Sequence, residues 1–299
     1  MTQTMTPIPP SFALFGNTFQ QSKSAAISQV ISCLRSYDAI ISIEKEYFRF
    51  LLNAGLIDGE RIIPFEAGNI NASFALSLGG DGTLLKTAAL VGRRQIPIVG
   101  INMGRLGFLA HVGPGDVDGV IRSLINNDYE VEERALIRVE TDGETIDGCN
   151  CALNDVAILK RDSASMIAIR ASIDGEHLTT YQADGLIVST PTGSTAYSLS
   201  NGGPIIVPRT GVLLLTAVAP HSLNVRPIVI PDSATIQLTV TSRNHTFLVA
   251  IDGRSQKLSS GTTLRLSRAD YSVRLVKRSG AHYFSTLREK MMWGADTRQ

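Results

Sequence analysis

The stretch Leu78-Gly79-Gly80-Asp81-Gly82-Thr83 joins the end of an apolar segment to the start of a helical pattern through three glycines and one carboxylate. Glycines let backbone N–H groups approach an anion closely, and a following helix adds the positive end of its dipole. A carboxylate beside a phosphate needs a separate task, such as orienting or deprotonating a hydroxyl that attacks a phosphoryl group. The alternative is a tight turn from strand to helix in which Asp81 is the N-cap. The turn alone leaves both interpretations open.

The residues around this turn alternate between short apolar segments and helical patterns. The expected strands cover residues 12–15, 39–43, 72–78 and 96–101. The expected helices lie around residues 27–34, 44–52, 84–89 and 117–124. Such alternation predicts an open parallel α/β layer over residues 11–128, whose ligands bind beyond the carboxyl ends of the strands.

The sequence changes character near residue 129. Short alternating segments follow one another, separated by turns such as Asp142-Gly143 and Asp174-Gly175, and they predict an all-β second domain over residues 129–276. A helical pattern returns near the end, and we expect residues 277–299 to pack back on the first domain. Residues 1–10 are expected to form a flexible tail.

Length and composition limit the possible partners. The 299 residues are 43% apolar and 18% charged, with a formal net charge of only +1. This length favours two domains, and the weak net charge predicts neither nucleic acid nor an anionic membrane as a partner. The longest apolar stretches are shorter than the ~20 residues that span a bilayer. Because the first ten residues carry no Lys or Arg, no secretory signal is predicted and we expect a soluble, cytoplasmic protein.

Cysteine and histidine show no metal-binding pattern. Cys33, Cys149 and Cys151 are odd in number, and the only close pair is a C-x-C without a matching second pair. Neither a disulfide scaffold nor a zinc site is therefore predicted, and free thiols in a reducing cytoplasm are the expected state. The five histidines are scattered without metal-ligand spacing, so we expect no metal held by the protein.

A second unusual segment contains Thr190-Pro191-Thr192-Gly193-Ser194-Thr195-Ala196-Tyr197-Ser198. Pro191 and Gly193 stiffen and bend this loop, while its hydroxyl and N–H groups could line a polar ligand. The small Ala196 would let a flat ring come close. The alternative is a Ser/Thr-rich β-turn without a ligand. Asp184, which precedes a glycine, could likewise be a turn residue.

Taken together, the motifs make the chain resemble the bacterial NAD kinases, the ATP/polyphosphate-NAD kinase family. The motifs are, in order, GGDGT (Gly79–Thr83), N-x-G-x-L-G-F (Asn102–Phe108), Asn154-Asp155, a D-G strand ending in T-P-T-G-S-T-A-Y-S (Asp184–Ser198), G-G-P (Gly202–Pro204), P-H-S-L-N-x-R-P (Pro220–Pro227) and Asp252-Gly253. A single GGDGT would be a weak signal, but the ordered set is a strong one.

The resemblance implies a role for each matching residue. Asp81 is expected to be the base toward the 2′-hydroxyl of the adenosine ribose of NAD. Lys86 is expected to contact ligand phosphate, with an ordinary lysine on the helix surface as the alternative. The implied phosphate turn consists of Gly79, Gly80, Gly82 and Thr83. The implied NAD-binding residues are Asp81, Gly82, Lys86, Asn154, Asp155, Ser165, Gln182, Asp184, Thr195, Ala196, Tyr197, Ser198, Leu199, Ser200 and Arg254.

The resemblance also implies a fold and a reaction. The expected fold is a Rossmann-like N-terminal domain followed by a β-sandwich C-terminal domain, with NAD in the cleft between them and a homodimer or homotetramer as the assembly. The expected reaction transfers the γ-phosphoryl group of ATP to NAD to give NADP. Mg²⁺ or another divalent cation would arrive with ATP, and no tightly bound cofactor is expected.

The chain departs from the family pattern at two positions. Asp155 stands where Glu is commoner, and Arg254 stands where Gln is frequent. Either departure could alter NAD affinity or contacts between subunits. These residues do not decide between ATP, another triphosphate and polyphosphate as donor, or between NAD and NADH as acceptor.

Two rival functions stay open. Lipid and sphingoid-base kinases also resemble this chain around a GGDGT turn, but the segments Thr190–Ser198 and Pro220–Pro227 count against them. A non-catalytic NAD(P)-binding sensor would keep the cleft and lose turnover, and the retained Asp81 counts against it. The sequence contains no G-x-x-x-x-G-K-[ST] and no H-R-D, which disfavours P-loop proteins and protein kinases. Leu85 replaces the third glycine of G-x-G-x-x-G, which disfavours a dehydrogenase.

Overall fold

The computed structural model describes residues 9–18, 24–66, 68–104, 107–161, 165–277 and 283–294. The chain divides into two compact units, the first made of Met1–Glu132 with Arg274–Gln299 and the second of Glu133–Val273. Residues 1–8 of the expected tail, residues 105 and 106 of the N-x-G-x-L-G-F segment, and parts of the expected returning segment lie outside the described residues.

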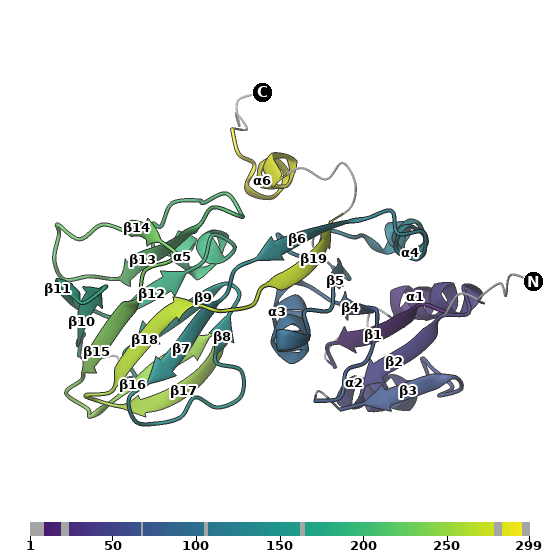
Figure 1. The fold of residues 1–299 in the computed structure, drawn as a ribbon, viewed down its shortest axis with the longest axis horizontal. Coiled ribbons are helices and arrows are strands. Elements are labelled where there is room, and N and C mark those ends of the chain that lie inside the picture. The colour runs from purple at the N-terminus through teal and green to yellow at the C-terminus, as the bar shows by residue number, and fades with distance from the viewer. Residues whose placement is uncertain are drawn as a thin grey trace, which may run out of the picture. The chain divides into compact units, whose positions relative to one another are not determined.

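The first unit is built around a seven-stranded sheet with the order β3-β2-β1-β4-β5-β19-β6 (Figure 1). Its strands are β1 (Ser11–Gly16), β2 (Ile40–Glu44), β3 (Ile62–Phe65), β4 (Phe74–Leu78), β5 (Ile98–Ile101), β6 (Glu130–Arg134) and β19 (Val273–Lys277). The pairs from β3 to β5 are all parallel. Because the chain moves outward from β1 to β3 and then returns to β4, the strand order reverses between β1 and β4. Ligands of such sheets bind at this reversal, outside the carboxyl ends of the strands.

The first unit contains five α-helices in its described residues, and those that pack on the core do so through apolar side chains that recur on one face. They are α1 (Ser24–Ser36), α2 (Lys45–Asn53), α3 (Asp81–Val91), α4 (Val117–Ile125) and α6 (Tyr283–Met291), with short 3-10 turns η2 (Gly92–Arg94) and η3 (Pro114–Asp116). Ile27, Val30 and Leu34 of α1 are fully buried in one core with Ile121 and Leu124 of α4. Helix α3 packs on β4 and β5, which holds the glycine turn at the end of β4.

The second unit is a β-sandwich of two six-stranded sheets, with the orders β11-β10-β15-β18-β7-β8 and β14-β13-β12-β9-β16-β17 (Figure 1). The strands are β7 (Ile137–Thr141), β8 (Cys151–Ala152), β9 (Asp155–Leu159), β10 (Ile167–Ile173), β11 (Glu176–Ala183), β12 (Gly185–Ser189), β13 (Val212–Val218), β14 (Ile228–Pro231), β15 (Ile236–Thr241), β16 (Thr246–Ile251), β17 (Arg254–Ser259) and β18 (Thr263–Arg268). Both sheets contribute side chains to one core. The predicted fold class, α/β followed by all-β, is confirmed.

Candidate active site

Asp81 is the first residue of α3, and its carboxylate holds a distant loop. Gly80 is the N-cap of the helix and provides no side-chain hydrogen bond, so Asp81 does not cap α3. Instead, Asp81 Oδ2 accepts the N–H of Phe108 at 2.7 Å, and Oδ1 accepts the N–H groups of Leu109 and Ala110 at 3.0 and 3.1 Å. Since a carboxylate oxygen has about two lone pairs, Oδ2 can accept one more hydrogen bond.

At two positions only glycine fits, because side-chain atoms of Asp81 and Thr83 lie too close to the backbone for a Cβ. A Cβ on Gly107 would lie 1.9 Å from Asp81 Oδ1, and a Cβ on Gly79 would lie 2.2 Å from Thr83 Oγ1. By contrast, a Cβ on Gly80 or Gly82 would meet no heavy atom within 4 Å. The backbone at Gly80 and Gly82 therefore borders open space at the N-terminal end of α3, where an anion is favoured.

A pocket of about 350 Å³ lies at the reversal of the sheet in the first unit. It is lined by residues at the end of β1, at the junction of β2 and α2, and in the first turns of α3. These residues are Gly16, Asn17, Thr18, Glu44, Glu46, Tyr47, Gly82, Thr83 and Lys86. Only the α3 residues of this pocket are predicted from the sequence, because residues 16–18 and 44–47 belong to no recognisable motif.

Two charged side chains of this pocket, Glu44 and Lys86, differ in burial and in the strength of their contacts. The buried Glu44 carboxylate accepts the N–H groups of Glu46 at 3.2 Å and Tyr47 at 3.0 Å, and so caps α2. Lys86 Nζ lies 3.8 Å from Glu46 Oε2, with side-chain exposures of 55% and 73%. Such an exposed pair contributes at most about 1 kcal/mol, so Lys86 is available to a phosphate.

In the second unit, Asp252 organises the segment that contains Asn154 and Asp155. Asp252 and Gly253 form the left-handed turn between β16 and β17, with φ of 48° and 79°. The Asp252 carboxylate accepts the N–H groups of Leu153 at 2.7 Å, Asn154 at 2.8 Å and Asp155 at 3.2 Å. Asp252 N–H donates in turn to the Asp155 carbonyl at 3.0 Å. Sequence reasoning recognised Asp252-Gly253 as a motif but not this role.

Asp155 is a buried carboxyl with a perturbed pKa. Its side chain is 7% exposed. Burial, together with the neighbouring charge of Asp252, raises the pKa of Asp155 to about 7. Burial also raises the pKa of Asp252, but three backbone N–H donors oppose that effect. Since those donors stabilise the ionised form of Asp252, Asp155 is the member of the pair that keeps a proton near neutral pH.

The hydroxyl-rich loop packs directly on Asn154. Thr190 N–H donates to the Asn154 carbonyl at 2.9 Å, and Thr190 Oγ1 donates to the Leu153 carbonyl at 2.6 Å. A Cβ on Gly193 would lie 2.1 Å from the Asn154 carbonyl oxygen, so only glycine fits there. The buried Arg134, which the sequence did not single out, donates to Thr192 Oγ1 at 3.1 Å.

The loop continues as a short 3-10 turn, η4 (Gly193–Thr195), and a short helix, α5 (Tyr197–Ser200). The buried Ser198 Oγ lies 2.8 Å from Thr216 Oγ1 of β13, whereas the Tyr197 side chain is exposed. Arg254 directly follows the Asp252 turn, and its Nη2 donates to the Cys149 carbonyl at 3.1 Å. The fold therefore gathers one group of predicted residues at this end of the sandwich, consisting of Asn154, Asp155, Thr195, Ala196, Tyr197, Ser198, Leu199, Ser200 and Arg254.

Asp184, Gln182 and Ser165 lie at the other end of β12. Asp184 precedes this five-residue strand and Thr190 follows it, so the two residues are separated by roughly 20 Å at the rise of an extended chain. Asp184 Oδ1 forms an ion pair with Lys160 Nζ at 2.7 Å. The Gln182 carbonyl accepts His221 N–H at 2.8 Å, and Ser165 comes just before β10, which starts opposite Ala183.

Within the described ranges, His, Cys, Asp and Glu side chains form no group of three or more that could hold a metal ion. No helix in the described part of the chain has the length and apolar character needed to cross a membrane.

Family models and curated relatives agree on one family. The ATP-NAD kinase N-terminal domain matches residues 66–129, and the ATP-NAD kinase C-terminal domain matches residues 153–278. An NAD kinase from Bacteroides fragilis is 52% identical over 287 residues, which cover 96% of this chain and 99% of the relative. An NAD kinase from Cytophaga hutchinsonii is 39% identical over 289 residues, with the same two shares covered.

Solved structures show the same fold. The structure of a yeast NADH kinase in complex with NADH has a TM-score of 0.86 at 23% identity, and covers 96% of this chain and 89% of its own. The structure of an NAD kinase from Archaeoglobus fulgidus in complex with ATP has a TM-score of 0.73 at 24% identity. The match covers 94% of this chain and 98% of that chain. The lipid or sphingoid-base kinase alternative is not favoured by these relatives. From the matching family models and from relatives aligned over nearly their whole length, we conclude that the chain belongs to the NAD kinase family.

Proposed function

We propose that this ATP-dependent NAD kinase uses Asp81 as its base. The proposed reaction transfers the γ-phosphoryl group of ATP to the adenosine ribose 2′-hydroxyl of NAD. The observation that carries the proposal is the hydrogen bonding of the Asp81 carboxylate. Three backbone N–H groups fix its orientation, while Oδ2 accepts only one of them and has a lone pair left for a hydroxyl. In this step Oδ2 takes the proton of the 2′-hydroxyl, the oxygen forms a bond to the γ-phosphorus, and the bond to the leaving oxygen of ADP breaks.

The phosphates of ATP bind at the turn Gly79–Thr83 in this proposal. The N-terminal end of α3, the open backbone at Gly80 and Gly82, and Lys86 all favour a negative group there. The pocket lined by Gly16, Glu44 and Lys86 would take the rest of the donor. ATP arrives as its complex with Mg²⁺ or another divalent cation, so the cation is part of the substrate. A relative with the same fold was solved with ATP, which supports ATP as the donor.

NAD binds to the second unit in this proposal. The group around Asn154, with its amide, the Asp155 carboxyl and the hydroxyls of residues 195–200, offers donors and acceptors for a ribose and an adenine. The exposed Tyr197 and the small Ala196 offer a surface for a flat ring. Because Ser165, Gln182 and Asp184 lie at the other end of β12, they would contact a different part of the bound dinucleotide.

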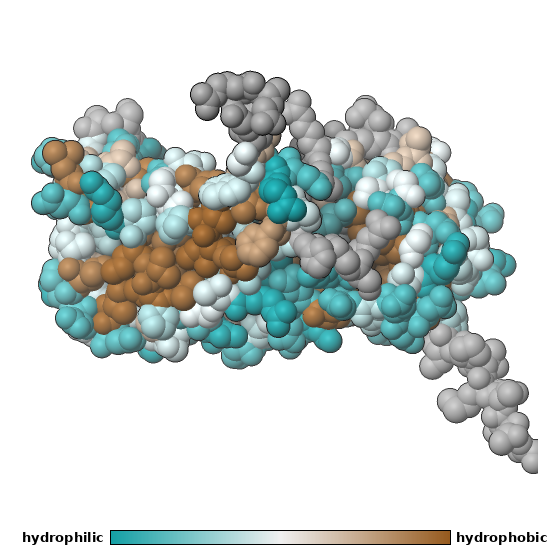
Figure 2. Space-filling model, turned by 90° about the horizontal axis from the view of Figure 1, so that it is seen from above, coloured by the Kyte–Doolittle hydropathy of each residue, from teal (hydrophilic) through white to brown (hydrophobic). Residues whose placement is uncertain are grey.

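We further propose a homodimer or homotetramer in the cytoplasm. Figure 2 shows a broad apolar band on one face of the second unit, and large exposed apolar residues of that unit include Met166, Val207, Leu223 and Val229. Contiguous apolar surface of this kind is typical of association sites. The cysteines are free, which supports a reducing compartment. Measurement of the mass in solution by light scattering would show whether the chain is a monomer, which would contradict this proposal.

The test of the catalytic assignment is an Asp81→Asn variant in a coupled assay for NADP with Mg²⁺-ATP as donor. Asn keeps the size of the side chain and removes the base, so kcat should fall by roughly 10²–10⁴-fold. Titration with NAD and circular dichroism serve as controls: the variant should be folded and should bind NAD, with a lowered melting temperature because an amide cannot accept all three N–H groups. An Asp81→Asn protein that forms NADP at the parental rate would remove Asp81 from the mechanism.

A further inference from the structure

A pocket on the first unit contains none of the residues assigned to the kinase reaction. It lies against α4, β5 and β19, and its volume of about 430 Å³ is within the range of pockets that take small ligands. Its lining includes the buried side chains of Val99 and Leu124, together with the partly buried Val120 and Val276. An apolar group that entered this pocket would be removed from water, which favours binding.

Two glycines leave space in the wall of this pocket. Gly119 lies inside α4 and Gly115 in the preceding turn η3, and both line the pocket. Glycine is a weak helix former, so a glycine inside a helix usually has a packing or backbone reason. Neither reason applies here, because a Cβ on either residue would meet no heavy atom of the described chain within 4 Å and neither has a positive φ. These glycines therefore keep open a volume that the protein itself does not fill.

The charged side chains of the lining are mostly acidic. Asp116, Asp118 and Asp128 line the pocket together with Lys277. Three carboxylates against one ammonium group favour a cationic ligand. In the part of the chain that the structure describes, His, Cys, Asp and Glu side chains form no group of three or more that could hold a metal ion, so these carboxylates do not converge on one point. Carboxylates spread beside apolar side chains suit an organic cation better than a metal ion.

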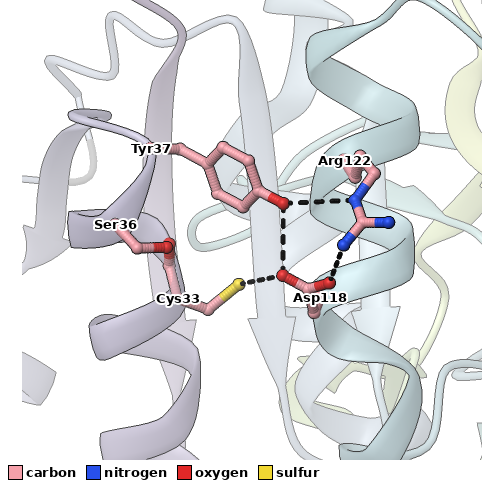
Figure 3. Close-up of polar contacts among 5 residues, drawn as sticks. All are labelled: Cys33, Ser36, Tyr37, Asp118 and Arg122. Atoms are coloured by element: carbon pink, nitrogen blue, oxygen red, sulfur yellow. Dashed lines mark hydrogen bonds and ion pairs between the residues drawn. The ribbon is translucent and has the colours of Figure 1, made fainter.

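Asp118 is held in a fixed orientation by contacts that join α4 to α1 (Figure 3). Its Oδ1 accepts the Tyr37 hydroxyl at 3.2 Å and the Cys33 thiol at 3.6 Å. Its Oδ2 accepts Arg122 Nη2 at 2.7 Å. Because the Arg122 guanidinium compensates much of the Asp118 charge, another carboxylate must provide the main contact for a cation.

Asp128 provides that carboxylate. The chain turns after α4 at Asn127, with φ of 55°, and Asp128 N–H donates to the Ser123 carbonyl at 2.8 Å. Asp128 is exposed, and its side chain forms no hydrogen bond or ion pair with the described residues. The next residue, Tyr129, also lines the pocket, and its ring lies edge-on to Phe74 with the ring centroids 5.3 Å apart. The pocket thus combines an unengaged carboxylate with an aromatic ring that the core holds in place, and both groups attract an ammonium ion.

We propose that this pocket binds a small amphipathic amine. The apolar body of the amine lies against Val99 and Leu124, in the space that Gly119 leaves open, and its ammonium group contacts Asp128. The site is separate from the kinase reaction, since its lining shares no residue with the pocket at the turn Gly79–Thr83. Both pockets can therefore be occupied at the same time.

The experiment uses three fluorinated probes that share one aromatic body, namely a phenethylamine, a phenethyl alcohol and a phenylpropionate. They are cationic, neutral and anionic at neutral pH, and their binding to the full-length chain is followed by fluorine NMR titration. The amine should bind about 2- to 5-fold more tightly than the alcohol, and the carboxylate should bind most weakly. Asp128→Asn should reduce the affinity for the amine to that for the alcohol, and should leave the affinity for the alcohol unchanged.

A second variant tests the position of the site. Gly119→Leu fills the open volume and should abolish binding of the amine and the alcohol alike. Since leucine is a better helix former than glycine, this variant should stay folded, which circular dichroism verifies. Gln29→Leu adds the same side chain at an exposed position of α1, so it is the matched control and should bind both probes like the parental protein.

The remaining outcomes divide clearly. Equal affinities of the parental protein for the three probes would overturn the role of charge. Unchanged binding in Gly119→Leu, or an amine that the parental protein does not bind, would overturn the site. Amine that stays bound at saturating Mg²⁺-ATP and NAD supports a separate pocket, whereas its displacement by either substrate would place it in the candidate active site and overturn the proposal.

Discussion

Replacing Gly107 by Ala should disable the site from a position that carries no side chain of its own. The added Cβ would lie 1.9 Å from Asp81 Oδ1, far below the 3.0 Å under which Cβ contacts essentially never occur, so the carboxylate or the loop must move. Movement breaks the hydrogen bonds from Phe108, Leu109 and Ala110. Bonds to a charged acceptor contribute roughly 1.5–3 kcal/mol each, and water replaces part of them at this half-buried side chain, so the expected loss of stability is about 2–4 kcal/mol.

That loss corresponds to a decrease in melting temperature of roughly 5–12 °C. Because a base that is not positioned loses most of its effect, kcat for NADP formation should fall by at least about 100-fold. The assays are thermal unfolding followed by circular dichroism and steady-state kinetics with Mg²⁺-ATP and NAD. Gly115→Ala is the matched control, since a Cβ there would meet nothing within 4 Å. A Gly107→Ala protein with the melting temperature and kcat of Gly115→Ala would refute the assignment of Asp81 as a side chain fixed by residues 107–110.

Three further outcomes follow from the second unit. Asp252→Ala leaves three backbone N–H groups without their acceptor and should lower the free energy of unfolding by about 3 kcal/mol in denaturant titrations. Asp174→Ala, which alters a similar Asp-Gly turn with one accepted N–H, should cost less than half of that, and equal losses would contradict the assignment. Asp155 binds its proton more tightly when folded than when unfolded, so its contribution disfavours folding increasingly as pH rises from about 4 to about 7 and then levels off. Asp155→Asn should flatten this part of the stability profile, and an unchanged slope in pH-dependent unfolding would count against the burial argument. Asp184→Ala should weaken NAD binding in a titration. The melting temperature should change little, because the half-exposed ion pair of Asp184 with Lys160 contributes about 1 kcal/mol or less. Superimposable NAD titrations of the two proteins would exclude a role of Asp184 in binding.

The fold class and the glycine turn are readable from the sequence because both depend on local patterns. Alternating apolar segments and helical periodicity predicted an α/β layer, and turn residues at regular spacing predicted the all-β part. Three strands have sequences whose local pattern does not indicate a strand. β3 contains Pro64, which is compatible only with an edge position, and β3 is such an edge. β17 is mainly polar, with Leu258 as its buried residue, and β11 is mostly polar and exposed, so neither shows a clear apolar alternation.

Tertiary structure alone decided how the candidate site is held together. The bonds of Asp81 reach residues 27 to 29 positions away, and those of Asp252 reach residues 97 to 99 positions away. No local pattern in the sequence encodes such pairs, because they form only when strands distant along the chain are placed side by side. The pKa of Asp155 near 7 has the same origin, since burial and the nearby Asp252 exist only in the folded second unit. The sequence determined which chemical groups are present and in which elements they lie, and long-range packing determined which of them meet.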